Sequence, residues 1–170
     1  GHVLVVTGGI GQTGAARRAG RGALRSGAGA GTLATPPSAL MDVAAQSTAV
    51  MCRSIKDGEA LAGCLEDARI NVVCVGPGLG LDARAAELFE ATLSAAPPRG
   101  ERTYLMQCRK LILDADALTL LSRRPDPFSG LGPHTVLTPH GGDFAWLFPE
   151  ISEKLAGRVQ GYSKGDAVRD

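Results

Sequence analysis

Six short apolar runs, each followed by a stretch with helical spacing or by a turn, constrain the fold of this chain more than any other feature of its sequence. Several runs are apolar on both faces, which is typical of strands that helices cover on both sides. Strands that alternate with helices favour parallel pairing, because a parallel connection needs a long crossover. The sequence therefore predicts a three-layer α/β/α fold around a mostly parallel sheet. The runs lie at residues 3–6, 31–35, 49–52, 71–75, 110–113 and 134–137.

The first predicted helix follows the run at 3–6 and shows how the layers fit together. We expect Thr13 to cap its start, because a hydroxyl accepts a hydrogen bond from an unpaired N–H of the first turn. Ala15, Ala19 and Ala23 recur every fourth residue and are expected to face the sheet, with a row of arginines facing solvent. Further helices are expected at about 38–46, 58–67 and 82–95, with short helices opening at Asp116, near Asp143 and near Lys164.

Composition places the chain among globular proteins and removes several classes of partner. It has 170 residues, of which 44% are hydrophobic and 21% are charged, and this length suits one domain. A formal net charge of +1 argues against a polyanion-binding surface, so we do not expect nucleic acid as a partner. No apolar run approaches the ~20 residues that span a membrane, and no signal peptide is recognisable. We therefore expect a cytoplasmic protein without a membrane partner.

The cysteines and the chain ends carry less information. The four cysteines, at positions 52, 64, 74 and 108, show no CxxC spacing, so we interpret them as reduced core residues. The chain begins at Gly1 almost directly on a predicted strand and stops within a charged segment. We expect that it is part of a longer domain, truncated at both ends.

Four of the predicted strands end in residues that can bind ligands. "TGGIGQTGAA" follows the run at 3–6, "GPGLG" follows 71–75, "DADAL" follows 110–113 and "TPHGGDF" follows 134–137. In open α/β sheets, ligands gather at the carboxyl ends of the strands. The four segments therefore predict a binding site at that edge of the sheet.

The segment after the first strand contains Gly9-x-Gly11-x-x-Gly14, a pattern of dinucleotide-binding folds. In those folds an acidic residue about 20 positions further along binds the ribose hydroxyls. Here the first acidic residue of the chain is Asp42, and the second predicted strand ends in "LATPPS". The sequence therefore argues against a Rossmann oxidoreductase. The glycines still place free N–H groups at a helix start, where they favour phosphate or another anion.

The next two segments allow more than one interpretation. Gly76, Gly78 and Gly80 are equally typical of a plain strand-to-helix turn and of close contact with a ligand. Asp116 stands where a helix cap is expected. Asp114 lies one step nearer the strand, where its carboxylate can order Mg²⁺ through water beside a phosphate.

His140 has the most informative neighbours of the three histidines, and we interpret the other two as structural or solvated. Pro139 restricts the backbone before the ring, and Gly141 and Gly142 expose N–H groups after it. The imidazole is therefore a candidate ligand contact.

Five motifs in a fixed order carry a family resemblance. "VLVVTGGIGQTGAA", "RSGAGAGTLATP", "VGPGLG", "LILDADALTLL" and "LTPHGGDFAWL" together resemble the ADP- or ATP-dependent NAD(P)H-hydrate dehydratases, which have a ribokinase-like fold. The match runs across essentially the whole chain. The resemblance therefore implies a single domain over residues 1–170, which is partial because its carboxyl-terminal nucleotide-phosphate portion is missing.

The resemblance implies a repair enzyme that acts on hydrated NADH or NADPH. Such proteins use ADP or ATP to phosphorylate the added hydroxyl and then expel phosphate to restore the dinucleotide. We accordingly expect small-molecule nucleotides as ligands, Mg²⁺ as cofactor with Asp114 beside it, and a homo-oligomeric assembly. Six residues are expected at the substrate site, because they match the family's substrate-binding positions or leave room for the substrate. They are Ala15, Gly78, Gly80, His140, Gly141 and Gly142.

Departures from the family pattern limit what the resemblance implies. The chain lacks the Gly-Thr-Gly-Asp motif whose aspartate is the base in ribokinase-like enzymes, so no catalytic residue is assigned and the chain alone is expected to be inactive. Gly141 replaces a usual proline, and Asp143 replaces a usual glutamate and is interpreted as a helix cap. Two alternatives stay open: a ribokinase-like kinase for a small alcohol such as a vitamin precursor, and a noncatalytic nucleotide-binding module.

Overall fold

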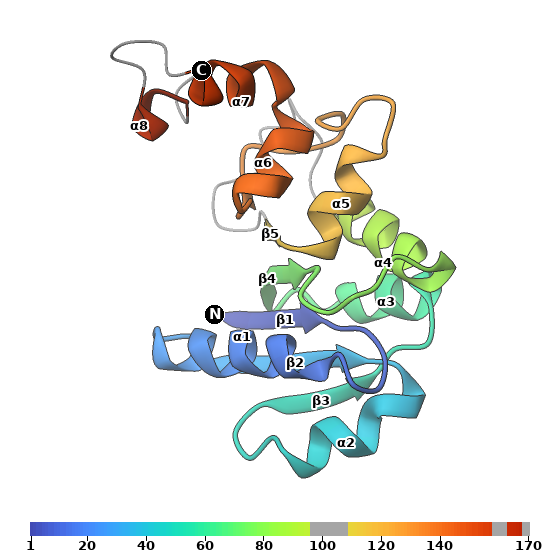
Figure 1. Cartoon of the computed structure of the whole chain (residues 1–170). Coiled ribbons are helices and arrows are strands. Elements are labelled where there is room, and N and C mark those ends of the chain that lie inside the picture. Colours follow the sequence, from blue (N-terminus) through green and yellow to red (C-terminus); the bar gives the residue numbers. More distant parts are fainter. Residues whose placement is uncertain (96–108, 158–162, 168–170) are drawn as a thin grey trace.

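The structure, a computed structural model, describes residues 1–95, 109–157 and 163–167. Within these ranges six strands form one sheet in the order β3-β2-β1-β4-β5-β6, and every neighbouring pair runs parallel (Figure 1). The predicted α/β class and parallel sheet are confirmed. The strands are β1 (His2–Val6), β2 (Ala30–Thr35), β3 (Met51–Ser54), β4 (Ile70–Val75), β5 (Lys110–Leu113) and β6 (Thr135–Leu137).

Helices lie on both faces of this sheet, as Figure 1 shows. They are α1 (Thr13–Arg25), α2 (Leu40–Ala45), α3 (Gly58–Leu65), α4 (Ala83–Ser94), α5 (Asp116–Ser122), α6 (Gly141–Leu147), α7 (Pro149–Ala156) and α8 (Lys164–Ala167), with a 3₁₀ turn η1 (Pro37–Ala39). α1 contacts β1 and β2, and α2 contacts β2 and β3. α3 packs on α4 against the opposite face. From α5 to α8, each helix contacts the next beyond the β5 and β6 side of the sheet.

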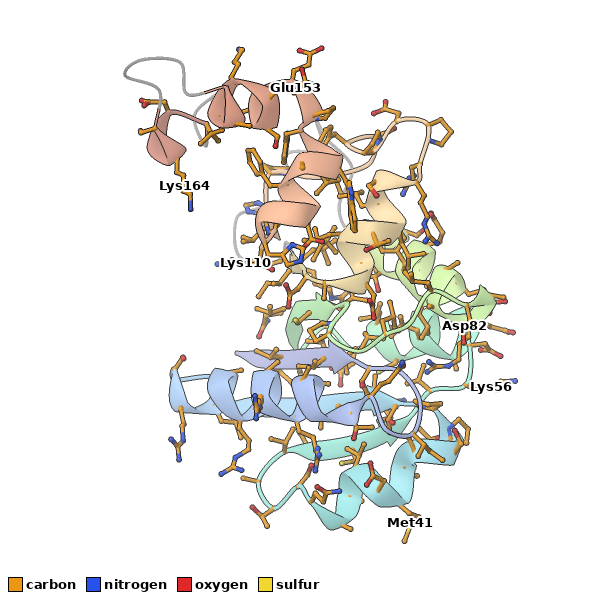
Figure 2. All side chains as sticks on the ribbon, viewed as in Figure 1. Met41, Lys56, Asp82, Lys110, Glu153 and Lys164 are labelled. Atoms are coloured by element: carbon orange, nitrogen blue, oxygen red, sulfur yellow. The ribbon has the colours of Figure 1, made fainter. Side chains whose placement is uncertain are left out.

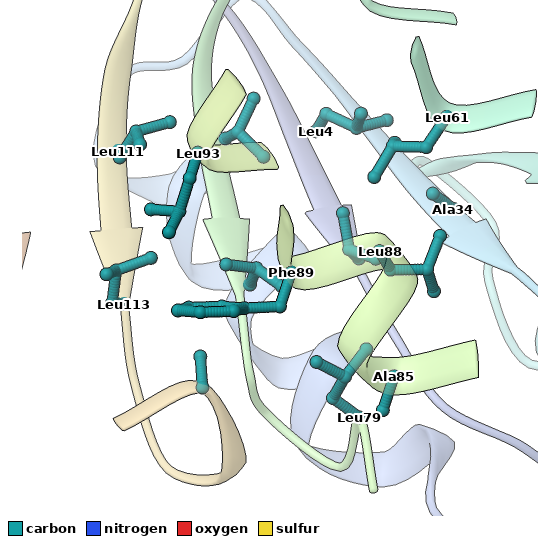
Figure 3. Close-up of a cluster of buried hydrophobic side chains, with 14 of the residues drawn as sticks. Leu4, Ala34, Leu61, Leu79, Ala85, Leu88, Phe89, Leu93, Leu111 and Leu113 are labelled. Carbon is teal, nitrogen blue, oxygen red and sulfur yellow. The ribbon is translucent and has the colours of Figure 1, made fainter. Parts of the chain in front are cut away.

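Two cores form because alternate residues of each strand point to opposite faces of the sheet. In β1, Leu4 and Val6 belong to the core under α3 and α4, whereas Val5 belongs to the core under α1 and α2. Figure 3 shows Leu88 and Phe89 of α4 extending toward the strands in the larger core. Burying a side chain such as Phe89 stabilises the fold by about 1.5–3 kcal/mol. This packing positions the strand ends that carry the predicted motifs.

α1 lies on the sheet with a face that is rotated from the predicted one. Its buried residues are Thr13, Ala16 and Gly20, and Ala15 is exposed. Positions four apart drift by about 40° per step around a helix, so a row of such residues does not stay on one face. Gly20 lets the helix approach closely, since a Cβ there would lie 3.2 Å from Leu33 Cδ2. The prediction that the alanine row faces the sheet therefore holds only in part, because Ala19 packs against the core under α1 whereas Ala15 is exposed.

The start of α1 also differs from the prediction. Thr13 is the first helical residue, while Gln12 occupies the cap position and makes no capping bond through its side chain. The Thr13 hydroxyl instead donates to Asp42 Oδ2 at 2.9 Å. Thr13 therefore ties α1 to α2 rather than capping α1.

Several boundaries moved, and one helix was missed. The third strand lies at Met51–Ser54 rather than 49–52, and the helix expected at 38–46 divides into η1 and α2. α7 was not predicted, although Pro149 stands at its first position. Proline there is a recognised start signal, because an N–H at the first helical position has no partner within the helix and its loss costs nothing. α8 begins at Lys164, as expected.

The cysteines agree with their interpretation where the structure describes them. Cys64 and Cys74 are buried and Cys52 is half-buried, and all three are free thiols. Burial raises the pKa of the Cys74 thiol to about 12. Cys108 lies outside the described residues. Within those residues, no helix has both the length and the apolar character that crossing a bilayer requires.

Candidate functional site

The loop after β4, residues 76–80, is called the glycine loop here. The physical reason for a glycine differs from one of its positions to another. Gly76 has a φ of 124° and Gly78 a φ of 66°, values that other residues rarely adopt. A Cβ on Gly76 would overlap the Asp114 carbonyl oxygen, and one on Gly78 would overlap that of Gln12. Close approach of neighbouring chain segments therefore explains these two glycines. Gly80 also has a positive φ, of 86°, but its surroundings differ: the nearest atom to a Cβ there would be Gln12 Oε1 at 3.8 Å, so its surface is open to a ligand.

Asp116 links the end of β5 to the glycine loop. Its Oδ2 accepts a 2.9 Å hydrogen bond from the N–H of Gly80. The predicted capping role is wrong, because Ala115 occupies the cap position of α5 and Asp116 is the first helical residue. Ala115 has a φ of 47°, a costly conformation of the kind that gathers at functional sites. This sharp turn lets the Asp116 carboxylate reach across to the neighbouring loop and hold its amide.

Asp114 links β5 to β6. Its Oδ1 accepts a 2.8 Å hydrogen bond from the Thr138 hydroxyl, and its N–H donates to the Val75 carbonyl at 3.1 Å. Among the described residues, no group of three or more His, Cys, Asp or Glu side chains is placed to hold a metal ion. The described residues therefore do not form an all-protein magnesium site. A single carboxylate at this edge fits Mg²⁺ that keeps most of its water ligands.

His140 caps α6, the helix that follows β6. Its Nδ1 accepts a 2.9 Å hydrogen bond from the N–H of Asp143, and its own N–H donates to Asp143 Oδ2 at 3.2 Å. Histidine thus takes the cap position, and Asp143 supplies the second half of a reciprocal capping box. The imidazole is 74% exposed, and with Pro139, Phe144 and Lys164 it lines a hollow of about 430 Å³. Figure 2 shows the Lys164 side chain extending from α8 toward the sheet side of the molecule.

Arg84, in the first turn of α4, is a residue that the sequence analysis missed. Its guanidinium donates to the carbonyls of Ile55 at 2.8 Å, Lys56 at 3.0 Å and Thr7 at 3.4 Å. It therefore joins the carboxyl ends of β1 and β3. Burial lowers the pKa of Arg84, but a guanidinium stays protonated in proteins. In "LDARAAELF" this arginine has the same pattern as any solvent-facing helical residue, so the sequence carried no signal for it.

These contacts join the loops after β1, β4, β5 and β6 into a row along one edge of the sheet. Gln12 touches the glycine loop, Asp116 joins that loop to β5, and Asp114 joins β5 to β6. Ala15 lies exposed in the first turn of α1, and His140 follows β6. Neighbouring strands lie about 4.8 Å apart, so the three steps from β1 to β6 span about 14 Å. The predicted residues thus share one edge, with His140 at its far end.

A larger hollow, of about 700 Å³, lies at the opposite, amino edge of the sheet. Its carboxylate, Asp67, is paired with Arg69 at 2.8 Å, and hydrogen bonds from Arg69 hold the pKa of Asp67 well below its usual range. Its histidine, His2, is hydrogen-bonded to the Thr32 hydroxyl at 2.8 Å. These groups already have partners, and none of the four predicted ligand segments lines this hollow. We therefore place the candidate site at the carboxyl edge.

Solved structures define the class of fold. A ribokinase-like superfamily protein from Enterococcus faecalis superposes with a TM-score of 0.68 at 26% identity, covering 86% of this chain and 48% of that protein. The ADP/ATP-dependent NAD(P)H-hydrate dehydratase from Bacillus subtilis, co-crystallised with ATP and Mg²⁺, superposes with a TM-score of 0.63 at 25% identity, covering 99% and 56%. The fold is ribokinase-like, as the resemblance implied.

Sequence comparison defines the family. The family model described as NAD(P)H-hydrate dehydratase matches residues 3–166. The bifunctional NAD(P)H-hydrate repair enzyme of Coxiella burnetii is 33% identical over 170 residues, which is all of this chain and 29% of that enzyme. The chain belongs to the NAD(P)H-hydrate dehydratase family. It spans about half the length of the two solved proteins and less than a third of the Coxiella enzyme.

Proposed function

We propose that this chain forms the substrate-binding part of an enzyme that repairs hydrated NADH or NADPH with ADP or ATP as second substrate. Membership of the family supports the substrate, and the name of the Bacillus subtilis relative supports the second substrate. The observation that carries the proposal is the row of contacts joining four motif-bearing loops along one edge. An edge about 14 Å long between β1 and β6 offers a dinucleotide contacts along its length.

The chemistry assigns this chain the work of binding and orienting. Phosphoryl transfer to the added hydroxyl depends on positioning and on neutralising charge, with little covalent work for the protein. Ala15 is exposed and small, Gly80 leaves its surface open, and His140 offers a ring N–H. Gly141 and Gly142 are exposed beside the ring. We propose that these residues contact the hydrated nucleotide, with Gly78 behind them shaping the loop.

Charge on the β1 side of this edge suits a phosphorylated ligand, whereas Asp114 and Asp116 place carboxylates on its β5 side. The chain carries no carboxylate before Asp42, and that residue is engaged by Thr13 and Gln46. Arg84 adds a fixed positive charge four residues after the glycine loop. Bound Mg²⁺ would neutralise the phosphates of ADP or ATP, and Asp114 would hold it through water. No base is assigned, because the Gly-Thr-Gly-Asp motif is not in this sequence.

A nucleotide-binding module without catalysis stays a second candidate. Both candidates predict binding by this chain, and both predict that the chain alone releases no phosphate from ADP or ATP. We further propose small-molecule nucleotides as its ligands, a cytoplasmic location and a homo-oligomeric assembly. The family resemblance supports the assembly.

A thermal-shift panel of NADH hydrate, NADPH hydrate, ADP, ATP and a thiazole alcohol tests the proposal. A ligand at 100 times its Kd stabilises a protein by about 2.7 kcal/mol, which raises the Tm of a domain this size by roughly 5–10 °C. We expect this shift with the hydrates. His140→Ala should reduce it, whereas His134→Ala, just before the opposite end of β6, should leave it unchanged.

The other outcomes of the panel separate the alternatives. Stabilisation by the thiazole alcohol alone would replace the proposal with a vitamin-precursor kinase. Stabilisation by ADP or ATP without any response to the hydrates would favour the noncatalytic module. An unchanged shift in His140→Ala would remove the histidine from the site.

A further inference from the structure

The contacts around His140 constrain its imidazole more than helix capping requires. The N–H of Asp143 points at Nδ1 from 2.9 Å, and Oδ2 of Asp143 lies 3.0 Å from the same nitrogen. Nδ1 therefore faces one donor and one acceptor, both from a single residue. Which ring nitrogen carries the proton decides what the exposed side of the ring offers to a ligand.

Accounting for the donors favours a bare Nδ1 in the neutral ring. The N–H of Asp143 belongs to the first turn of α6, where amides have no acceptor within the helix. A bare Nδ1 accepts that N–H, while Asp143 Oδ2 accepts the N–H of His140 in return. A proton on Nδ1 could be accepted by Asp143 Oδ2 at 3.0 Å, but it would leave the Asp143 amide facing another donor at 2.9 Å, whereas Oδ2 already accepts the N–H of His140. The ring proton therefore belongs on Nε2.

Gly142 provides the space in which this ring lies. A Cβ on Gly142 would lie 2.9 Å from Cε1 of the His140 ring, 3.5 Å from Nδ1 and 3.6 Å from Nε2. Real Cβ atoms do not approach other atoms that closely, so an added methyl would push the ring away from its capping position. The missing side chain of Gly142 thus makes room for the imidazole itself, besides any room that it leaves for a ligand.

We infer that Gly142 and Asp143 are positioning residues that hold His140 as its Nε2–H tautomer and present this N–H to the ligand. The identity of the ligand rests on the proposed function. The imidazole and Lys164 line the same hollow, so two donors face it. The ligand atom that meets them is a hydrogen-bond acceptor, such as a phosphate or ribose oxygen, and not an amino group.

The first test measures the tautomer in the 170-residue chain without ligand. ¹⁵N NMR of histidine-labelled protein at about pH 8.5, about two pH units above the pKa of a free histidine, distinguishes bare from protonated ring nitrogens. We expect a bare Nδ1 and a protonated Nε2 for His140. Gly142→Ala should change these signals, whereas Gly63→Ala, which adds a methyl at an open position of α3, should not. A proton on Nδ1 in the wild type would overturn the inference.

The second test separates the two nitrogens by substitution. His140→Asn places a capping acceptor near the position of Nδ1 and nothing at that of Nε2, and His140→Gln does the reverse. We expect the asparagine variant to keep the Tm and to bind NADPH hydrate about 10- to 100-fold more weakly by calorimetry, the size of one hydrogen bond to a charged group. The glutamine variant should have the lower Tm of the two and the tighter binding. Binding as tight as wild type in His140→Asn would overturn the role of Nε2.

The two tests distinguish failure of this inference from failure of the proposed function. If the wild type binds no hydrate but shows the Nε2–H tautomer and its dependence on Gly142, the positioning stands and the proposed substrate falls. If the hydrate binds, and Gly142→Ala binds as tightly as Gly63→Ala, the positioning falls and the substrate stands.

Discussion

Replacing Arg84 by methionine tests whether one guanidinium holds the carboxyl edge of the sheet together. The side chain reaches from α4 to the carbonyls of Ile55, Lys56 and Thr7, at 2.8, 3.0 and 3.4 Å. Methionine keeps an unbranched apolar stem and preserves most of the packing, but it donates no hydrogen bond. The variant therefore isolates the polar contribution of the guanidinium.

The magnitude follows from the distances and the burial of Arg84. Two of its three bonds are short enough to count fully, and each hydrogen bond from a charged group contributes about 1.5–3 kcal/mol. Full burial would make their sum about 3–6 kcal/mol. Because Arg84 is half-buried, water replaces part of what is lost, and we expect the free energy of unfolding to fall by about 2–3 kcal/mol. The Tm should fall by about 5–10 °C.

Urea unfolding followed by circular dichroism measures this change. Arg84→Lys should recover less than half of the loss, because an ammonium does not reproduce a planar fork that meets three carbonyls. Arg21→Met, on the exposed side of α1, is the matched control and should change the free energy of unfolding by less than about 0.5 kcal/mol. If Arg84→Met were as stable as Arg21→Met, the reasoning would be refuted, since the three bonds would then contribute nothing.

Two further predictions concern the glycine loop and acid stability. Gly76→Ala should lower the free energy of unfolding in urea by more than about 2 kcal/mol, because the added methyl overlaps the Asp114 carbonyl and φ is positive at this position. Gly63→Ala, at an open position of α3, is the control and should raise the free energy of unfolding by up to about 1 kcal/mol. Asp57 caps α3, and its hydrogen bond from the Ala60 N–H lowers its pKa. Its stabilisation is therefore present above about pH 4 and lost as the pH falls through the lower folded pKa. The free energy of unfolding, measured between pH 6 and pH 2, should fall less steeply with decreasing pH in Asp57→Ala than in the wild type. Parallel curves for the two proteins would contradict this.

The sheet, its motifs and the family were predictable because their determinants are local. The apolar run at 71–75 is a strand whatever lies beside it, and "GPGLG" must turn wherever it occurs. The capping box of α6 also had a local signal, since Asp143 follows His140 by three residues. The sequence analysis interpreted Asp143 itself as the helix cap, because caps are usually Ser, Thr, Asp or Asn, whereas His140 takes that position in the structure.

Other features depended on residues far apart in the chain. The buried face of α1 is set by the contact of Gly20 with Leu33 of β2, which lies 13 residues further along the chain and outside the helix. Asp116 was interpreted as a cap because its local pattern fits one, but its partner is the amide of Gly80, 36 residues away. Arg84 donates hydrogen bonds to carbonyls at the ends of two other strands, and no local sequence pattern indicates these bonds.

The sequence by itself determined which segments are strands and helices, that the strands run parallel, and which loops carry the family's motifs. The tertiary structure decided which of those loops touch, which side chains reach a neighbouring loop, and which nitrogen of His140 is engaged in capping. The physical reason is that backbone preference and apolar spacing act over a few residues, whereas the order β1-β4-β5-β6 brings together loops that are far apart in the chain. The partners in the hydrogen bonds between those loops meet only after the sheet has formed, so no local sequence pattern encodes these bonds.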